Sequence, residues 1–223
     1  MTLLTLALAP VVIILIYIYF RDKYGKEPIG LLLKGLLAGV FITLPIIITE
    51  KILSIPAEGF SGLSYTAWQS FIVAALTEES FKFLAVFLLF WKSSEFDERF
   101  DGIVYAVFVS LGFAAVENIM YVFNHGMGTG IMRALTAVPA HALFGITMGY
   151  YIGLAKFIPN LRQKLLTKAI LYPLILHGLY NFLILSGHLI LLLLFIPYLI
   201  YLWRSGSKKM NELSKRSQNN FDL

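Results

Sequence analysis

The chain contains no cysteine, and only 14% of its 223 residues are charged. Without cysteine there is no disulfide framework, no thiol nucleophile and no thiolate metal site. Hydrophobic residues make up 58% of the chain, compared with about 45–50% in a typical soluble domain, and the mean hydropathy is +0.77. This composition excludes an ordinary soluble globular protein and indicates an integral membrane protein.

The excess of basic residues does not indicate a nucleic-acid partner. The formal net charge is +5 at pH 7, but the lysines and arginines lie in short segments between apolar runs. They do not alternate with aromatic residues in a polar stretch, as they would on a nucleic-acid-binding surface. We therefore expect the lipid bilayer as a partner and no nucleic acid.

Seven apolar stretches follow one another along the chain, and most have about the 20 residues needed to cross a bilayer as a helix. They cover residues 3–20, 30–53, 65–91, 102–124, 131–156, 168–187 and 188–204. The sequence therefore predicts an all-α, polytopic transmembrane helical bundle with seven spans. Only Ser186, Gly187 and His188 separate the last two stretches, which form either a tight hairpin of two spans or one span and a re-entrant piece.

The basic residues predict the orientation of the chain in the membrane. The first stretch is followed, not preceded, by basic residues, so we expect it to remain as a span and not to be a cleaved signal peptide. Segments 21–29, 92–101, 156–168 and 204–216 hold fourteen of the eighteen lysines and arginines. The positive-inside rule then puts the N-terminus outside and the C-terminus in the cytoplasm. Arg133 and Glu50 are interpreted as interfacial.

The domain organisation is expected to be simple. Residues 1–204 would form one membrane-embedded domain, and residues 205–223 a basic, disordered cytoplasmic tail. The acidic segment 95–101 is interpreted as a solvated loop and not as a metal site. Three glycines at four-residue intervals in the fifth stretch should allow another helix to approach closely: Gly145, Gly149 and Gly153.

The third stretch carries two adjacent carboxylates and a lysine, Glu78, Glu79 and Lys82. Glu78 and Lys82 share a helix face, and Glu79 lies about 100° around the helix. Two carboxylates this close in an apolar medium should not both ionise readily, while Lys82 favours the charged form of one of them. An ion pair that only joins helices would explain Glu78 and Lys82, but the second carboxylate points to acid–base chemistry.

Further polar residues lie inside later stretches: Glu117, Asn118, His141, His177 and Asn181. His177 and Asn181 are one turn apart on one face. Counted from the expected span ends at about 1.5 Å per residue, these side chains and Glu78 lie at middle depth or in the outer half of the bilayer. Each alone would be typical of a hydrogen bond between helices, but their common depth predicts that they meet.

Several catalytic classes are excluded by what these stretches lack. No aspartate lies in any of them, which excludes an intramembrane protease with paired aspartates. There is no His-Glu-x-x-His motif and no convincing serine nucleophile, since Gly62-Leu63-Ser64 has no glycine after it. Glutamate with histidine remains, which suits general-base activation of water against a carbonyl, with histidine and asparagine donating to the oxyanion.

The ordered set of motifs resembles the PrsW family of glutamic-type intramembrane proteases, which are related to the CAAX prenyl proteases. The resemblance covers nearly the whole chain and is carried by Glu78-Glu79-x-x-Lys82, Phe113-x-x-x-Glu117-Asn118, the His141 segment and His177-x-x-x-Asn181. It implies a multi-pass endopeptidase of the bacterial plasma membrane. Its substrate would be a single-span anti-sigma factor, cut near the outer face as site-1 cleavage in a stress response.

The resemblance also suggests roles for these residues. Glu78 or Glu79 would activate water, Lys82 would tune the pair, and Glu117 and His141 would complete the water side. His177 and Asn181 would stabilise the oxyanion, a role carried over from the CAAX relatives, which have a histidine where this chain has Glu117. We expect no cofactor and no metal. The alternatives are a non-catalytic scaffold or immunity-type binding protein, an ion-coupled transporter, and a zinc protease using the same glutamates and histidines.

Overall fold

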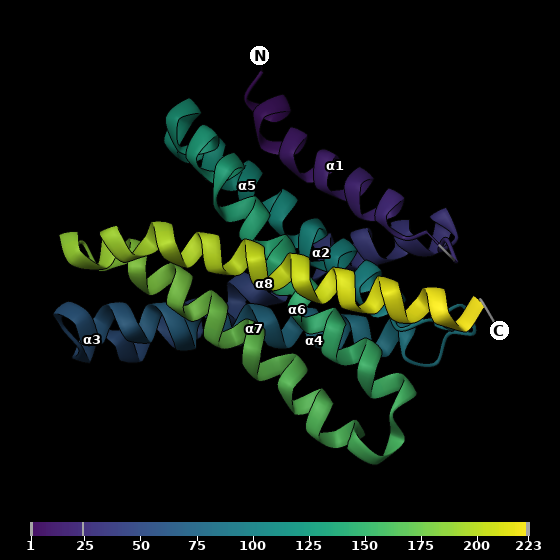
Figure 1. Ribbon diagram of the computed structural model, residues 1–223. Helices are drawn as coiled ribbons and strands as arrows, with labels where there is room; N and C mark the ends of the chain where they lie inside the picture. Colours follow the sequence, from purple (N-terminus) through teal and green to yellow (C-terminus); the bar gives the residue numbers. More distant parts are fainter. Residues whose placement is uncertain (1, 24, 222–223) are drawn as a thin grey trace.

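The computed structural model describes residues 2–23 and 25–221, with the backbone alone for residues 217–221. Every regular element in this part of the chain is helical (Figure 1), which confirms the predicted all-α class. The α-helices are α1 (Leu3–Arg21), α2 (Ile29–Ser54), α3 (Gly62–Ala67), α4 (Thr77–Phe90), α5 (Asp101–Leu135), α6 (Ala137–Phe157), α7 (Arg162–Leu185) and α8 (Leu189–Phe221). Two 3₁₀ turns, η1 (Ile55–Gly59) and η3 (Pro159–Leu161), and a π-helix, η2 (Trp68–Leu76), complete the chain.

Five helical segments of the described chain are long and apolar enough to cross a membrane, judged by length and composition. They are Leu3–Arg21, Ile29–Gly59, Asp101–Phe157, Pro159–Leu185 and Leu189–Arg216. The third of these joins α5 and α6. The segment from α3 to α4, which carries Glu78, Glu79 and Lys82, is not among them. The last two apolar stretches are separate helices, because the chain turns at Gly187 with a φ of +66°.

Helix α5 forms the centre of the bundle and packs against α1, α2 and α6. Glycines make its crossing with α6 close, as the spacing of Gly145, Gly149 and Gly153 predicted. A Cβ on Gly149 would lie 2.1 Å from the carbonyl oxygen of Gly102, and one on Gly153 would lie 2.1 Å from that of Arg99. Small residues let the two backbones touch, and that contact fixes the position of α6 relative to α5.

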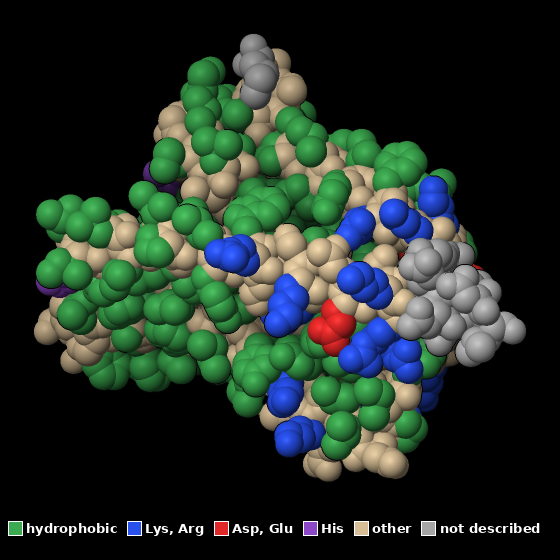
Figure 2. All heavy atoms as spheres, viewed as in Figure 1, with side chains coloured by type: hydrophobic (Ala, Val, Ile, Leu, Met, Phe, Trp, Pro, Cys, Tyr) green, Lys and Arg blue, Asp and Glu red, His purple; other side chains and the backbone are tan. Residues whose placement is uncertain are grey.

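The expected disordered tail is wrong for the part of it that is described, because α8 continues as a helix to Phe221. Met210 and Leu213 are buried within the main apolar core. A Cβ on Gly206 would lie 2.5 Å from the side chain of Leu143 in α6. An amphipathic helix with one apolar face therefore replaces the tail, and lysines and arginines gather over this half of α8 on the face seen in Figure 2.

The interpretation of segment 95–101 as a solvated loop is also wrong for two of its acids. Glu95 and Asp97 are exposed, but Glu98 and Asp101 are only 5% and 0% exposed. Phe96 explains the difference, because its ring is buried and packs edge-on against Tyr105 at 5.4 Å. Because this aromatic side chain is buried, the loop packs against the end of the bundle, and Glu98 and Asp101 are buried with it.

Replacing Gly149 with alanine should destabilise the bundle. The new Cβ would meet the Gly102 backbone, which cannot move without shifting α5, so we expect a loss of about 1–3 kcal/mol in the free energy of unfolding. Gly128→Ala is the control, because its Cβ would meet nothing and helix propensity should raise stability by about 0.5–1 kcal/mol. Thermal unfolding in detergent, followed by tryptophan fluorescence, measures both; equal midpoints for Gly149→Ala and wild type would contradict the close crossing.

Candidate active site

The paired glutamates lie where a π-helix becomes an α-helix. Helix η2 ends at Leu76, and α4 begins at Thr77, directly before Glu78 and Glu79. The Thr77 hydroxyl donates to the carbonyl of Ile72, five residues back, at 3.5 Å. Long π-helices are rare, and π-turns are concentrated at functional sites. The change of helix type sets the direction in which both carboxylates enter the bundle.

Lys82 connects the two carboxylates. Its Nζ donates to Glu78 Oε2 at 2.8 Å and to Glu79 Oε1 at 2.9 Å. It also lies 3.2 Å from His141 Nδ1 and 4.4 Å from the centre of the Phe113 ring. The lysine is 1% exposed, and both glutamates are buried. The sequence predicted that Lys82 would share a face with Glu78, and the structure shows that it reaches both acids.

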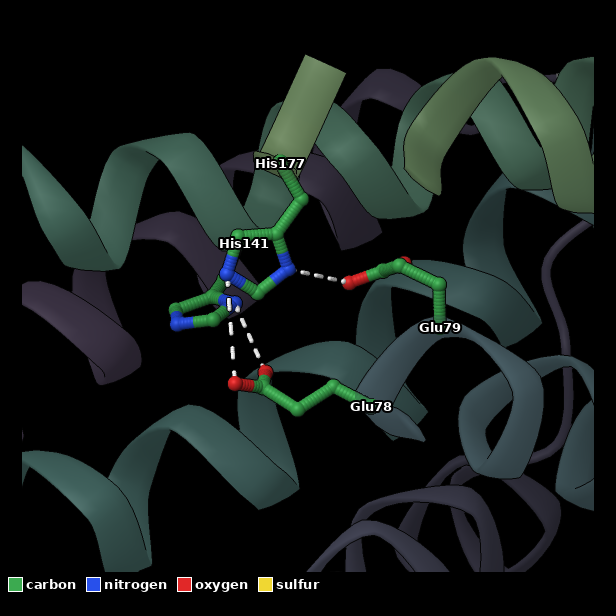
Figure 3. A group of neighbouring side chains, drawn as sticks. All are labelled: Glu78, Glu79, His141 and His177. Carbon is green, nitrogen blue, oxygen red and sulfur yellow. Dashed lines mark hydrogen bonds and ion pairs between the residues drawn. The ribbon is translucent and has the colours of Figure 1, made fainter. Parts of the chain in front are cut away.

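Two histidines from other helices complete the cluster (Figure 3). His177, from α7, has Nδ1 3.0 Å from Glu79 Oε1 and Nε2 3.9 Å from Glu78 Oε1. His141, from α6, has Nδ1 4.0 Å from Glu78 Oε2, while its Nε2 lies 3.0 Å from Glu117 Oε2. The structure therefore brings together the glutamates and histidines whose common depth predicted that they meet. Their catalytic roles remain a prediction.

Arg133, which we had interpreted as interfacial, also contacts this site. Its Nη2 lies 2.6 Å from Glu117 Oε2, and its Nε donates to Asn118 Oδ1 at 2.9 Å. In a straight helix, sixteen residues would separate Arg133 from Glu117 by about 24 Å. Helix α5 instead breaks at Gly126, with φ 81° and ψ −171°, so that its last part folds back beside Glu117. The glycines at 126, 128 and 130 were the signal for this turn.

Asn118 extends the network away from the glutamates and towards the first helix. It is fully buried, and its Nδ2 donates to the carbonyl oxygen of Ala7 in α1 at 2.8 Å. Its other side-chain atom, Oδ1, accepts from Arg133. Asn118 thus holds α1 and the folded-back part of α5 together behind Glu117.

A cavity of about 1030 Å³ opens beside the cluster and reaches the C-terminal ends of α2 and α7. Glu78, Glu117, Arg133 and Asn181 are among its polar lining residues, together with Glu50, which we had placed at the interface. Glu79, His141 and His177 are not in its wall. Asn181 makes no side-chain hydrogen bond to any described residue, so its predicted role rests on its place in the wall. Of the adjacent glutamates, Glu78 is the one that a cavity-bound molecule meets.

The cluster also has the composition of a metal site. One ligand atom from each of Glu78, Glu79, His141 and His177 lies within 4.8 Å of the other three. Glu79 Oε2 is buried and has no hydrogen-bond partner among the described residues. Two carboxylates and two imidazoles are a donor set that fits zinc. The Lys82 ammonium, 2.8–3.2 Å from three of these residues, would have to move or lose its proton beside such an ion.

The sequence was compared with known families and proteins. A family described as "PrsW family intramembrane metalloprotease" matches residues 27–202. "Protease PrsW" of Clostridioides difficile strain 630 is 38% identical over 225 aligned positions, covering 98% of this chain and 94% of that protein. "Protease PrsW" of Bacillus subtilis strain 168 is 36% identical over 210 positions, covering 93% of each.

A third relative, "Protease PrsW" of Geobacillus kaustophilus strain HTA426, is 42% identical over 185 positions, covering 83% of this chain and 80% of that protein. No solved structure matches the chain. The family's description names metal chemistry, which we had not expected from the sequence alone. The matches extend over nearly the full length of several relatives, and the helices include several that can cross a membrane. The chain is therefore a peptidase and multi-pass membrane protein that belongs to the PrsW family of intramembrane proteases.

Proposed function

We propose that this peptidase carries out site-1 cleavage of a membrane-anchored, single-span anti-sigma factor in a bacterial stress response, with Glu78 activating the attacking water. One observation carries the mechanism: Glu78 is both a member of the buried ionic cluster and part of the cavity wall. The substrate class comes from the family resemblance. A cavity that opens among helices, with apolar walls and a few polar groups, suits an unwound segment of a substrate helix.

The two oxygens of Glu78 have different neighbours. Oε2 accepts from Lys82 at 2.8 Å, whereas Oε1 lies 3.9 Å from His177 Nε2, farther than a direct hydrogen bond. A water molecule placed at Oε1 would give its proton to Glu78 as its oxygen attacks the scissile carbonyl carbon. Glu78 would then pass that proton to the leaving amine nitrogen, so the carboxylate is regenerated when the peptide bond breaks.

The other members of the site support this step. Lys82 stabilises the ionised forms of both Glu78 and Glu79, so that Glu78 begins the reaction as a base. His177 and Asn181 would donate hydrogen bonds to the oxyanion as it forms. Glu117, held by Arg133, fixes the orientation of His141 on the water side. If a divalent metal is bound, Glu78, Glu79, His141 and His177 would hold it, and it would acidify water and polarise the carbonyl.

The proposed topology has seven spans, with the N-terminus outside and the C-terminus in the cytoplasm. Lysines and arginines are gathered at one end of the face in Figure 2, and the opposite end is mainly apolar. In this orientation the C-terminal ends of α2 and α7 face outward. The cavity reaches these ends, through Ser54 and Leu185 among others, so cleavage would occur in the outer half of the membrane.

Reporter fusions test this topology. Alkaline phosphatase inserted at Gly187, between α7 and α8, should be active, because that turn would lie outside the membrane. Green fluorescent protein fused to the C-terminus should fluoresce, because it would remain in the cytoplasm. An inactive phosphatase at Gly187 in a chain that is inserted and expressed would contradict seven spans in this orientation.

Glu78→Gln should abolish cleavage. Loss of a general base lowers the rate by about 10²–10⁴-fold, and Asn181→Ala should lower it by about 10²–10³-fold through loss of an oxyanion donor. Each variant is co-expressed with tagged single-span anti-sigma factors, and the shortened fragment is followed by blotting. Glu58→Gln and Asn160→Ala are the controls, because both residues are exposed and lie outside the cavity wall.

The same cleavage assay distinguishes the glutamate mechanism from a metal-dependent one. With purified protein in detergent, the glutamate mechanism predicts that cleavage continues after exhaustive chelation. Activity that is lost on chelation and restored by zinc would overturn that mechanism and assign a metal to the four-residue cluster. Full cleavage by Glu78→Gln would contradict both forms of the proposal. If wild type cuts no candidate factor, the anti-sigma assignment fails, although the peptidase itself can still be tested on other single-span proteins.

A further inference from the structure

A second buried cluster lies at the end of α5 remote from Glu117. It consists of four acids, Asp22, Glu27, Glu98 and Asp101, which are 2%, 4%, 5% and 0% exposed. Asp22 and Glu27 come from the connection between α1 and α2, Glu98 from the loop before α5, and Asp101 from the first residue of α5. The active-site cluster contains histidines and a lysine, whereas this one offers oxygen atoms alone.

None of Asp22, Glu27 and Asp101 forms an ion pair with a lysine or arginine that the structure describes. The Nζ of Lys26, which directly precedes Glu27, lies over the rings of Tyr19 and Phe20, at 4.8 and 4.9 Å. Burial, reinforced by the neighbouring acids, raises the pKa values of Asp22 and Glu27 to about 7. Several carboxylates so confined need a positive charge or protons.

Some hydrogen bonds hold these carboxylates in place, but they do not involve all of the carboxylate oxygen atoms. The Tyr105 hydroxyl donates to Glu27 Oε2, and the Glu98 backbone N–H donates to Asp101 Oδ2 at 2.6 Å. Two oxygens with almost no solvent contact, Asp22 Oδ2 and Asp101 Oδ1, have no hydrogen-bond partner among the described residues. Buried carboxylate oxygens without a donor are rare in folded proteins and call for an explanation.

The distances between the acidic oxygen atoms offer such an explanation. Single oxygen atoms from Asp22, Glu98 and Asp101 all lie within 4.8 Å of one another. The backbone also leaves space for them, because a Cβ on Gly25 would lie 2.7 Å from Glu98 Oε1. Three convergent carboxylates without nitrogen or sulfur ligands are typical of sites for hard divalent cations.

We propose that Asp22, Glu98 and Asp101 form a binding site for a hard divalent cation, Mg²⁺ or Ca²⁺, with Glu27 oriented beside it by Tyr105. The cation would join the α1–α2 connection to the start of α5. Asp101 and Glu117 are sixteen residues apart on α5, or about 24 Å along the helix. The cation site is therefore separate from the active-site cluster, and its role would be to stabilise the helix that carries Glu117.

Terbium luminescence tests the site directly. The full chain in detergent is stripped with chelator and titrated with Tb³⁺, which replaces Ca²⁺ and is excited through nearby tyrosines such as Tyr105. The titration is done in the Glu78→Gln, Glu79→Gln, Lys82→Met triple variant, so that the active-site cluster does not contribute and no buried lysine is left without its carboxylates. We expect saturable emission that Ca²⁺ or Mg²⁺ displaces, and a higher thermal unfolding temperature with either ion.

Matched variants identify the ligands. Asp101→Asn and Glu98→Gln should weaken Tb³⁺ binding by at least about tenfold, as expected for lost contacts at a metal site. Asp97→Asn, which removes an exposed acid from the same loop, should bind as the parent does. If the ligand variants do not fold, the parent protein decides: no saturable emission and no cation-dependent unfolding temperature overturns the proposal. Equal loss in Asp97→Asn also overturns it, because binding would then reflect surface charge.

Discussion

A lysine ammonium bonded to two adjacent carboxylates is an expensive group to bury in an apolar bundle, and each of the three charges depends on the others. Lys82 bonds to Glu78 and Glu79 at 2.8 and 2.9 Å, and all three side chains are almost completely buried. Removing one partner from such a group leaves an uncompensated charge in an apolar medium. Helices α6 and α7 meet α4 at this ion pair, where His141 contacts Lys82 and His177 contacts Glu79.

Helix α5 connects this ion pair to the rest of the bundle. Glycine contacts hold it against α6 and α2: a Cβ on Gly112 would lie 2.0 Å from the carbonyl oxygen of Leu36, and Gly149 meets Gly102 as closely. The helix begins at the acidic cluster around Asp101, and its middle carries Glu117 into the active site. The break at Gly126 then returns Arg133 to Glu117, so that this carboxylate has its own counter-charge and does not depend on Lys82 alone.

Much of this could be predicted from the sequence, because the relevant physics is local. Apolar runs of suitable length predicted the helices. The fixed rise per residue of a helix predicted a common depth for Glu78, Glu117, His141 and His177, and the structure brings these side chains together. The glycine spacing in α6 gave the close crossing. In each case a periodic pattern along one helix was enough.

The remaining features depend on single torsion angles or on contacts far apart in sequence. The contact of Arg133 with Glu117 was missed because it depends on one glycine, Gly126, in a conformation that other residues rarely adopt. The burial of Asp101 was not predicted, because it depends on the packing of Phe96 against Tyr105. The helix after Ser205 was missed because a basic composition conceals the narrow apolar face formed by Met210 and Leu213.

The most direct test of the account is a double-mutant cycle on Lys82, measured as the free energy of unfolding in detergent. Lys82→Met should lower stability by about 3–5 kcal/mol in the wild-type chain, because it leaves two buried carboxylates without their cation. In the Glu78→Gln, Glu79→Gln background the same substitution should not lower stability, because it removes a buried lysine whose two carboxylate partners are already gone. An equal loss in both backgrounds would contradict the claim that this ion pair determines the arrangement of the site.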